Sequence, residues 1–352
     1  MSLESTQTAW NRCGGLVMVV MTLIGWSSVP LFIKHFASHI DVWTSNGWRY
    51  GFSALLWLPV LIWGLRRNSL PSGIWKRALV PSVFNSIGQV AFAWAHYKID
   101  PGLLTFALRT QIVFVAIGAA ILFIPERRII RSRGFIIGIL LVLGGTMTTV
   151  ALDDGFGQQA TMFGIILALV SGICFAGYAL SVRHYMHGTH PLVAFSVISQ
   201  YTAAAMLGLM FAIGERQGLL VLAMPPPQIA LLLLSAIIGI ALGHVFYYAS
   251  IGRLGVAVSS GVIQLQPVLV SAASVFLFPD AALSSVQWGT GLIAVAGAGT
   301  ILYMQHRLRA VTPPAPRSDH RATSTAETDA AQFDTLPPDH VAAALAAHDR
   351  DD

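Results

Sequence analysis

The sequence predicts an all-α integral membrane protein with ten transmembrane helices, and three observations support this. Only 37 of the 352 residues are charged, which is 11%, against about 25% in soluble domains. Hydrophobic residues make up 55% of the chain, and the mean hydropathy is +0.67. Apolar runs of about 20 residues, the length that crosses a bilayer, recur ten times. This composition excludes a typical water-soluble enzyme.

The ten predicted spans follow one another with short connections. The first five cover 14–36, 43–64, 78–97, 102–124 and 134–152. The second five cover 161–183, 191–213, 228–250, 256–278 and 286–304. The first run has no small-residue cleavage site, so it is expected to be a retained span and not a removed signal peptide.

The basic residues predict the orientation, because cytoplasmic loops are enriched in Lys and Arg. With both termini inside, 16 of the 21 basic residues fall on the cytoplasmic side. Only Lys34, Lys98 and Arg216 fall outside, and Arg49 and Arg109 fall within spans. We therefore expect an N-in, C-in multi-pass protein of a bacterial inner membrane.

Two segments flank the predicted membrane core. Residues 1–13 are expected to form a cytoplasmic N-terminus. Residues 305–352 are rich in Pro, Ser, Thr, Asp and Ala, a composition that cannot bury a core, so they are predicted to be a disordered cytoplasmic tail.

The chain matches itself in two copies. At an offset of 149 Trp26 aligns with Phe175, and at an offset of 154 Phe92 aligns with Phe246 and Thr110 with Gln264. Five spans per copy is an odd number, so the second copy would enter the membrane from the opposite side. Inverted repeats of this kind are typical of secondary transporters, which bind substrate where the halves meet.

Both copies carry similar short motifs. The first copy has Leu23-Ile24-Gly25-Trp26, Arg49-Tyr50 and Phe123-Ile124-Pro125-Glu126; the second has Arg253-Leu254-Gly255, Gln266-Pro267-Val268 and Phe278-Pro279-Asp280. With these motifs the chain resembles the EamA family of the drug/metabolite transporter superfamily. The resemblance implies two EamA repeats, at 14–152 and 161–304, and a transport function.

Two positions depart from the family pattern. Asp280 replaces the usual Glu, and Arg109-Thr110-Gln111 stands where the family has an apolar turn leading to Pro. The first copy therefore lacks the proline that Pro267 supplies in the second, and its fourth helix is expected to be straighter.

The two arginines inside the spans need an explanation, because a charge at the bilayer centre costs about 2.5–3.5 kcal/mol. Arg49 lies about 9 Å from the outer end of its helix at 1.5 Å per residue, so it could anchor at the interface or serve as a second pathway charge. Arg109 lies about 11 Å deep by the same rise. It is predicted to contact an anion in the pathway, with bracing of neighbouring carbonyls as the alternative.

Helical spacing groups further polar residues with these arginines. Asn85, Gln89 and His96 fall on one helix face, and the repeat-related spans bring similar faces together. The predicted substrate-binding residues are Arg109, Gln111, Asn85, Gln89, His96, Tyr248, Gln264 and Trp26, with Arg49 as the second pathway charge. Each of these side chains could instead serve only to bond a neighbouring helix.

The absence of an acidic residue in the middle of any span indicates the charge of the expected substrate. Every Asp and Glu of the membrane core falls at a helix end or in a loop. A transporter of organic cations would need a buried acid, so we expect a small zwitterionic or anionic metabolite such as an amino acid, exported by alternating access. His96 and His244 are candidates for proton coupling, since the reference pKa of His is about 6.5.

Other functions stay open at this stage. Multidrug or toxic-compound efflux is the alternative transport function. A membrane sensor that signals through 305–352, or an intramembrane enzyme that uses His96 or His244, is the alternative of another class. Catalytic, cofactor, metal-binding and nucleic-acid-binding motifs are not found in the sequence, and the oligomeric state is not predicted.

Overall fold

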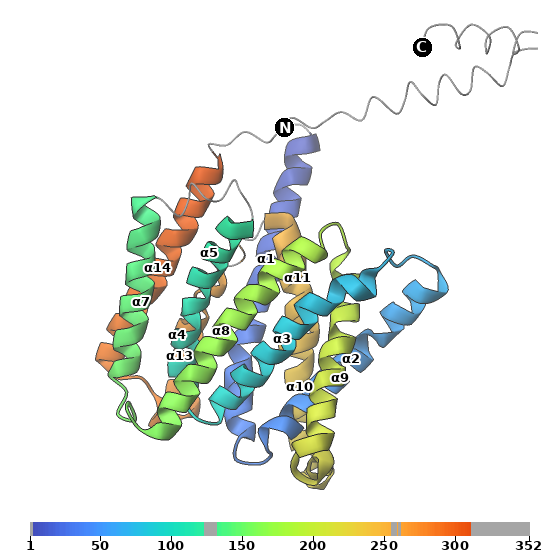
Figure 1. Ribbon diagram of the computed structural model, residues 1–352. Helices are drawn as coiled ribbons and strands as arrows, with labels where there is room; N and C mark the ends of the chain where they lie inside the picture. Colours follow the sequence, from blue (N-terminus) through green and yellow to red (C-terminus); the bar gives the residue numbers. More distant parts are fainter. Residues whose placement is uncertain (1–2, 123–131, 255–258, 260–261, 311–352) are drawn as a thin grey trace, which may run out of the picture. The chain divides into compact units, whose positions relative to one another are not determined.

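The computed structural model describes residues 3–122, 132–254, 259 and 262–310. Within these residues every regular element is a helix and no strand occurs (Figure 1). The Pro125-Glu126 pair, the basic residues at 127, 128 and 131 and the tail from 311 lie outside the described residues.

The first half of the chain contains four long helices and one interrupted one. The long helices are α1 (Leu3–Phe36), α2 (Val42–Arg66), α3 (Ile74–His96) and α7 (Arg133–Ala151). The fourth predicted span is divided into α4 (Pro101–Ala107), the 3-10 turn η1 (Leu108–Thr110) and α5 (Gln111–Leu122).

The second half follows the same plan. Its long helices are α8 (Gln159–Tyr185), α9 (Pro191–Ile213) and α14 (Ser285–Ala310), and the ninth span is described as α13 (Gln266–Leu277). The eighth span joins α10 (Pro226–Ala236), the π-helix η4 (Ile237–Leu242) and α11 (Gly243–Leu254). Short 3-10 turns, η3 (Glu215–Ala223) and η5 (Pro279–Ala281), occupy loops.

Helix starts carry the capping residues that the sequence supplies. The Asp41 carboxylate accepts hydrogen bonds from the backbone N–H groups of Trp43 and Thr44, both at 3.0 Å, at the start of α2. It also accepts the N–H of Glu215 at 3.1 Å. Proline stands in the first turn of α4, α9 and α10, where its missing N–H has no helical partner to lose.

Seven helical segments within the described residues are long and apolar enough to cross a membrane. They are Cys13–Phe36, Ile74–His96, Pro101–Gly118, Arg133–Ala151, Gln159–Tyr185, Pro191–Ile213 and Pro226–Leu254. The other three predicted spans coincide with α2, which carries Arg49, with the 12-residue α13 and with α14. A count of ten spans stays a prediction.

Helices from the two halves pack against one another throughout the bundle. Helix α3 packs on α8, α1 on α11, α2 on α9, and α4 on α13. Cores of buried apolar side chains fill these contacts, among them a cluster around Phe92, Leu104 and Leu167 between α3, α4 and α8. An ion pair between Lys34 Nζ and Asp100 Oδ1, at 2.6 Å, joins the end of α1 to the start of α4.

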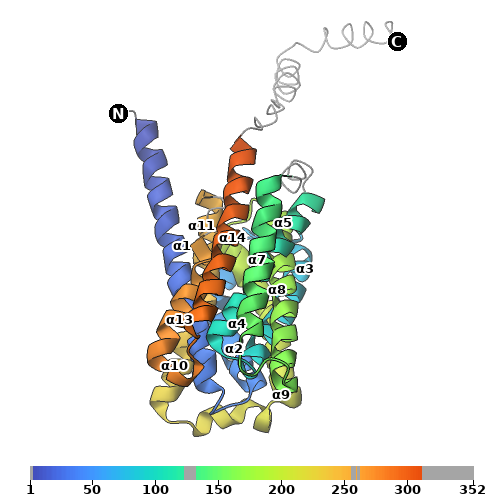
Figure 2. The same cartoon turned by 90° about the vertical axis from the view of Figure 1, so that its left-hand side faces the viewer.

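Helices α7 and α14 touch through their backbones and lie side by side in both views (Figures 1 and 2). A Cβ atom added to Gly145 would lie 2.6 Å from the Ala294 nitrogen, and one added to Gly138 would lie 2.9 Å from the Gly297 oxygen. Small residues that allow such approach drive helix association in membranes. These glycines make α7 and α14 a tightly joined pair.

The expectation that the fourth helix is straighter than its counterpart stays a prediction. These elements show that the fourth helix is not α-helical throughout, because the 3-10 turn η1 occupies Leu108–Thr110. The side chains there compete for backbone carbonyls: Thr110 Oγ1 donates to the Ala107 oxygen at 2.8 Å and Arg109 Nε to the Thr105 oxygen at 3.1 Å. Helix α14 continues to Ala310 and so covers the first residues of the segment predicted to be disordered.

Candidate functional site

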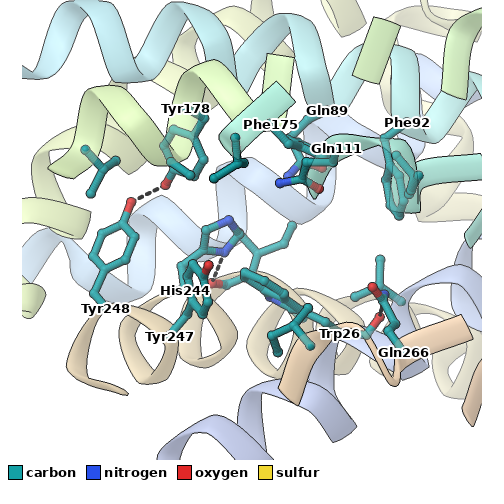
Figure 3. Close-up of a pocket in the computed structure, with 18 of the residues that line it drawn as sticks. Trp26, Gln89, Phe92, Gln111, Phe175, Tyr178, His244, Tyr247, Tyr248 and Gln266 are labelled. Carbon is teal, nitrogen blue, oxygen red and sulfur yellow. Dashed lines mark hydrogen bonds between the residues drawn. The ribbon is translucent and has the colours of Figure 1, made fainter. Parts of the chain in front are cut away.

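A cavity of about 160 Å³ lies between the two halves of the bundle. One wall comes from α3, α5 and α8, and carries Gln89, Gln111, Phe175 and Tyr178 (Figure 3). The facing wall comes from α1, α11 and α13, and carries Trp26, His244, Tyr247 and Gln266. The cavity also reaches Arg183, close to the C-terminal end of α8.

Two interrupted helices meet at this cavity. The fourth span breaks at η1, and the ninth has a turn at 264–265 directly before α13. Arg109 Nη1 donates to the Ile263 oxygen at 2.9 Å, a contact between residues 154 positions apart, the offset of the internal repeat. Helix interruptions at membrane depth are tolerated where the backbone is buried in protein or lines a cavity.

Arg109 is surrounded by acceptors. Besides Thr105 and Ile263, its guanidinium donates to Gln264 Oε1 at 3.4 Å and to Gln266 Oε1 at 3.1 Å. Gln266 in turn donates from Nε2 to the Trp26 oxygen at 2.8 Å. Arg109 therefore joins the break in the fourth span to the break in the ninth, and through Gln266 to α1.

Arg49 has a different environment in the same cavity. Arg49 is only 2% exposed, so its side chain is packed inside the bundle and does not extend to the protein surface. Arg49 Nε donates to Ser235 Oγ of α10 at 3.0 Å. Its Nη2 atom is buried without a hydrogen-bond partner, although Arg49 lines the cavity.

Aromatic rings from several helices also line the cavity. Trp26 packs edge-on against His244 with ring centroids 5.4 Å apart, and its Nε1 donates to the Gly239 oxygen in η4 at 3.1 Å. The hydroxyl groups of Tyr178 and Tyr248 are hydrogen-bonded to each other (Figure 3). His244 Nδ1 donates to the Ile240 oxygen at 3.0 Å, which fixes the ring at the cavity wall.

The structure brings most of the predicted site residues together. Those that line the cavity are Trp26, Gln89, Arg109, Gln111, Tyr248, Gln264 and, as the second charge, Arg49. Asn85 and His96 are not among the lining residues. Asn85 Nδ2 donates to Thr202 Oγ1 of α9 at 3.1 Å, and His96 Nδ1 donates to the Phe92 oxygen of its own helix at 2.8 Å.

The separation of these three residues of α3 has a simple cause. Helix α3 packs against both α8 and α9, so the face that holds Asn85 turns towards α9. Gln89 and Phe92 are the residues of α3 that line the cavity. Spacing alone placed Asn85, Gln89 and His96 within one face, but the two neighbours divide that face.

Several lining residues were not among the predicted substrate-binding residues, although His244 was expected to act in proton coupling. They are Tyr50, Phe92, Phe175, Tyr178, Arg183, His244, Tyr247 and Gln266, with Gly239 in the π-helix. The adjacent motifs offered a signal for two of them, because Tyr50 follows Arg49 and Gln266 precedes Pro267. The aromatic residues carry no such signal, since rings at helical spacing more often fill a core.

The charged residues that line the cavity, among those the structure describes, are Arg49, Arg109 and Arg183, with no Asp or Glu. Within the described residues, no group of three or more His, Cys, Asp or Glu side chains could hold a metal ion.

Comparisons with known proteins identify the family. No curated protein matches the chain. Seventeen chains in solved structures match the fold. One of them, described as "Crystal structure of protein", has a TM-score of 0.58 and 15% identity, over 84% of this chain and 98% of the other. The EamA-like transporter family matches residues 14–151 and 162–303, most of the chain, as the motifs predicted. The chain is a multi-pass membrane protein that belongs to the EamA-like transporter family.

Proposed function

We propose that this protein is a secondary transporter of a bacterial inner membrane that moves a small zwitterionic or anionic metabolite, such as an amino acid, out of the cell. In this proposal the chain has ten spans in two inverted five-helix repeats, with both termini in the cytoplasm. The two halves move so that the central cavity opens alternately to each side of the membrane. The observation that carries the proposal is the meeting of two interrupted helices at one cavity between the halves. Interrupted helices of this kind build substrate sites in secondary transporters.

The packing pattern supports the inverted repeat. Exchanging each span for its repeat partner turns the α3–α8 contact into the α11–α1 contact, and the α5–α8 contact into the α13–α1 contact. The α2–α9 and α4–α13 contacts each join two partners. Such a pattern is expected for two halves related by a two-fold axis in the membrane plane.

The extent of the cavity supports an exporter. In the proposed orientation α8 and α11 run towards the cytoplasm, so Arg183 and Ile251, which line the cavity, lie near its cytoplasmic side. The ion pair of Lys34 with Asp100 lies at the opposite side. This extent matches the inward-facing arrangement in which an exporter takes up its substrate.

The histidine in the cavity supports proton coupling. His244 lines the cavity, and its Nδ1 is committed to the Ile240 oxygen, which leaves Nε2 to exchange a proton. His96 does not line the cavity, so His244 is the better candidate of the two.

Transport by purified protein tests the proposal. Proteoliposomes that contain the full chain are incubated with a bacterial small-molecule extract, and the trapped compounds are identified by mass spectrometry against protein-free liposomes. We expect enrichment of anionic or zwitterionic metabolites. Enrichment of lipophilic cations alone would favour multidrug efflux, and no enrichment of any compound would contradict transport. A variant that ends at residue 304 should retain transport, whereas a sensor would lose its function.

A further inference from the structure

We propose that Arg49, and not the deeper Arg109, binds the negative charge of the substrate, and that the substrate is an organic carboxylate with a flat apolar body. This inference rests on the proposed function and names the substrate class of the same cavity. It assigns different roles to two arginines that carry the same charge and line the same space.

The first argument is the unsatisfied donor on Arg49. Arginine stays protonated in proteins and presents five N–H donors. Arg49 uses Nε on Ser235, while Nη2 is buried with no partner. An unsatisfied buried donor is costly, and a carboxylate in the cavity would satisfy it with a charge-assisted hydrogen bond.

The second argument is what covers the guanidinium beside Gly239. Gly239 lies in the π-helix and lines the cavity, and a Cβ atom added there would lie 3.8 Å from Arg49 Nη2. The side chain of Val29, another lining residue, already packs against this position. A substrate carboxylate therefore reaches Nη2 by moving the apolar Val29 side chain, without displacing a polar partner.

The third argument removes Arg109 from the same role. Its Nε, Nη1 and Nη2 atoms all donate to protein oxygens, on Thr105, Ile263, Gln264 and Gln266. A substrate carboxylate would have to displace these acceptors and break the link between the two interrupted helices. Arg109 therefore acts as a brace, which means that it holds the two interrupted helices together. The dipoles of its acceptor groups already compensate its charge.

The fourth argument sets the body of the substrate. Rings of Trp26, Tyr50, Phe92, Phe175 and Tyr178 line the cavity, and flat groups pack well against such faces. The volume of about 160 Å³ is comparable to an apolar cavity of about 150 Å³ that holds a benzene ring. One ring with a short acidic chain fits this space.

The fifth argument concerns an amino group on the substrate. Among the residues that the structure describes, no Asp or Glu lines the cavity, so an ammonium would find ring faces, amides and hydroxyls there. Arg49 and Arg109 would also repel it. A carboxylate without an amine should therefore bind more tightly than the matching amino acid.

The test uses three probes that share a phenyl ring and a two-carbon chain. They are 3-phenylpropionate, phenylalanine and phenethylamine, which are an anion, a zwitterion and a cation. Binding to the purified full chain in nanodiscs is measured by calorimetry. We expect the affinity to fall in that order, because only the first combines a carboxylate with no ammonium.

Variants then separate the two arginines. Arg49→Gln should weaken 3-phenylpropionate binding by about tenfold or more, the value of one charge-assisted hydrogen bond, and should abolish the preference for the anion. Arg49→Lys keeps the charge and should restore part of the affinity. Arg109→Gln, measured on protein that elutes as a folded monodisperse species, should lose less affinity than Arg49→Gln and should keep the preference for the anion, because it weakens the brace and not the carboxylate contact.

Defined outcomes would overturn the inference. They are unchanged binding by Arg49→Gln, an equal loss in folded Arg109→Gln, tightest binding of phenethylamine, or binding of none of the probes by the parent chain. The proteoliposome assay stands apart from these. Binding that follows Arg49 without transport would contradict the proposed function alone, and transport that is indifferent to Arg49 would contradict this inference alone.

Discussion

Arg109 and Arg49 line the same cavity, yet their surroundings are opposite. The Arg109 guanidinium donates to oxygens on four residues from two interrupted helices. The Arg49 guanidinium donates to Ser235 and keeps Nη2 buried without a partner. Both side chains are nearly inaccessible, at 4% and 2% exposure. Burial therefore does not distinguish a structural arginine from a ligand-binding one, whereas the hydrogen-bond partners do.

The largest expected effect is a loss of stability in Arg109→Met. The change leaves three acceptors, on Ile263, Gln264 and Gln266, without their donor, at about 1–3 kcal/mol each. Removing a buried charge recovers only about 2.5–3.5 kcal/mol. We expect the free energy of unfolding, measured by SDS titration, to fall by about 3 kcal/mol. Unchanged unfolding would show that Arg109 does not brace the helices.

A double-mutant cycle between Arg109 and Gln266 should give the next largest effect. Their side chains are hydrogen-bonded at 3.1 Å, so Arg109→Met and Gln266→Leu should be non-additive by about 1–3 kcal/mol. The matched control pairs Gln266→Leu with Arg49→Met, because Gln266 and Arg49 share no hydrogen-bond partner among the described residues, and this pair should be additive within about 0.5 kcal/mol. Coupling energies of equal size in both cycles would show that Gln266 interacts with Arg49 as strongly as with Arg109, which would contradict the different roles of the two arginines.

Arg49→Met should change stability in the opposite direction to Arg109→Met. It removes a buried charge, worth about 2.5–3.5 kcal/mol, and leaves only Ser235 without its donor, at about 1–3 kcal/mol. The free energy of unfolding, measured by SDS titration, should therefore rise by about 1 kcal/mol. A loss of 3 kcal/mol or so would mean that Arg49 is also a brace.

The smallest effect is expected at a partly exposed charge. Lys34→Met removes the ion pair with Asp100, whose side chains are 32% and 38% exposed. Exposed pairs contribute about 0.2–1 kcal/mol, and salt screens them. We expect a change within this range that shrinks when the unfolding is repeated at high salt. A larger, salt-independent change would show that the outer side of the bundle depends on this contact.

Much of the fold was accessible from the sequence, because lipid imposes a strong rule on helix length. Apolar runs located the helices, and the self-matches with the EamA motifs located the two copies that the family comparison also finds. The break in the fourth span was not accessible. Without a proline at Arg109-Thr110-Gln111 the sequence favoured a straight helix, whereas side-chain hydrogen bonds to Thr105 and Ala107 accompany a 3-10 turn.

The candidate site was predicted in outline only. Mid-span polarity pointed to Arg109, Gln111, Gln89 and Gln264, all of which line the cavity. Helical spacing could not tell that Asn85 faces α9 or that His96 bonds its own helix. Helical spacing also could not show which of the two arginines braces the helices and which binds substrate. The depth of a residue along a span does not show which acceptors a neighbouring helix places beside it.

The π-helix in the eighth span accommodates one more residue than regular α-helical winding would over the same length. Each residue advances an α-helix by about 100°, so the wide turn at Ile237–Leu242 sets which side of α11 looks inward. If these residues wound as a regular α-helix with no residue deleted, His244, Tyr247 and Tyr248 would turn away from Trp26 by about that angle, whereas deleting one residue as well would leave them facing the cavity. A change in the winding of these six residues would therefore rotate all the aromatic side chains of α11 that line the cavity.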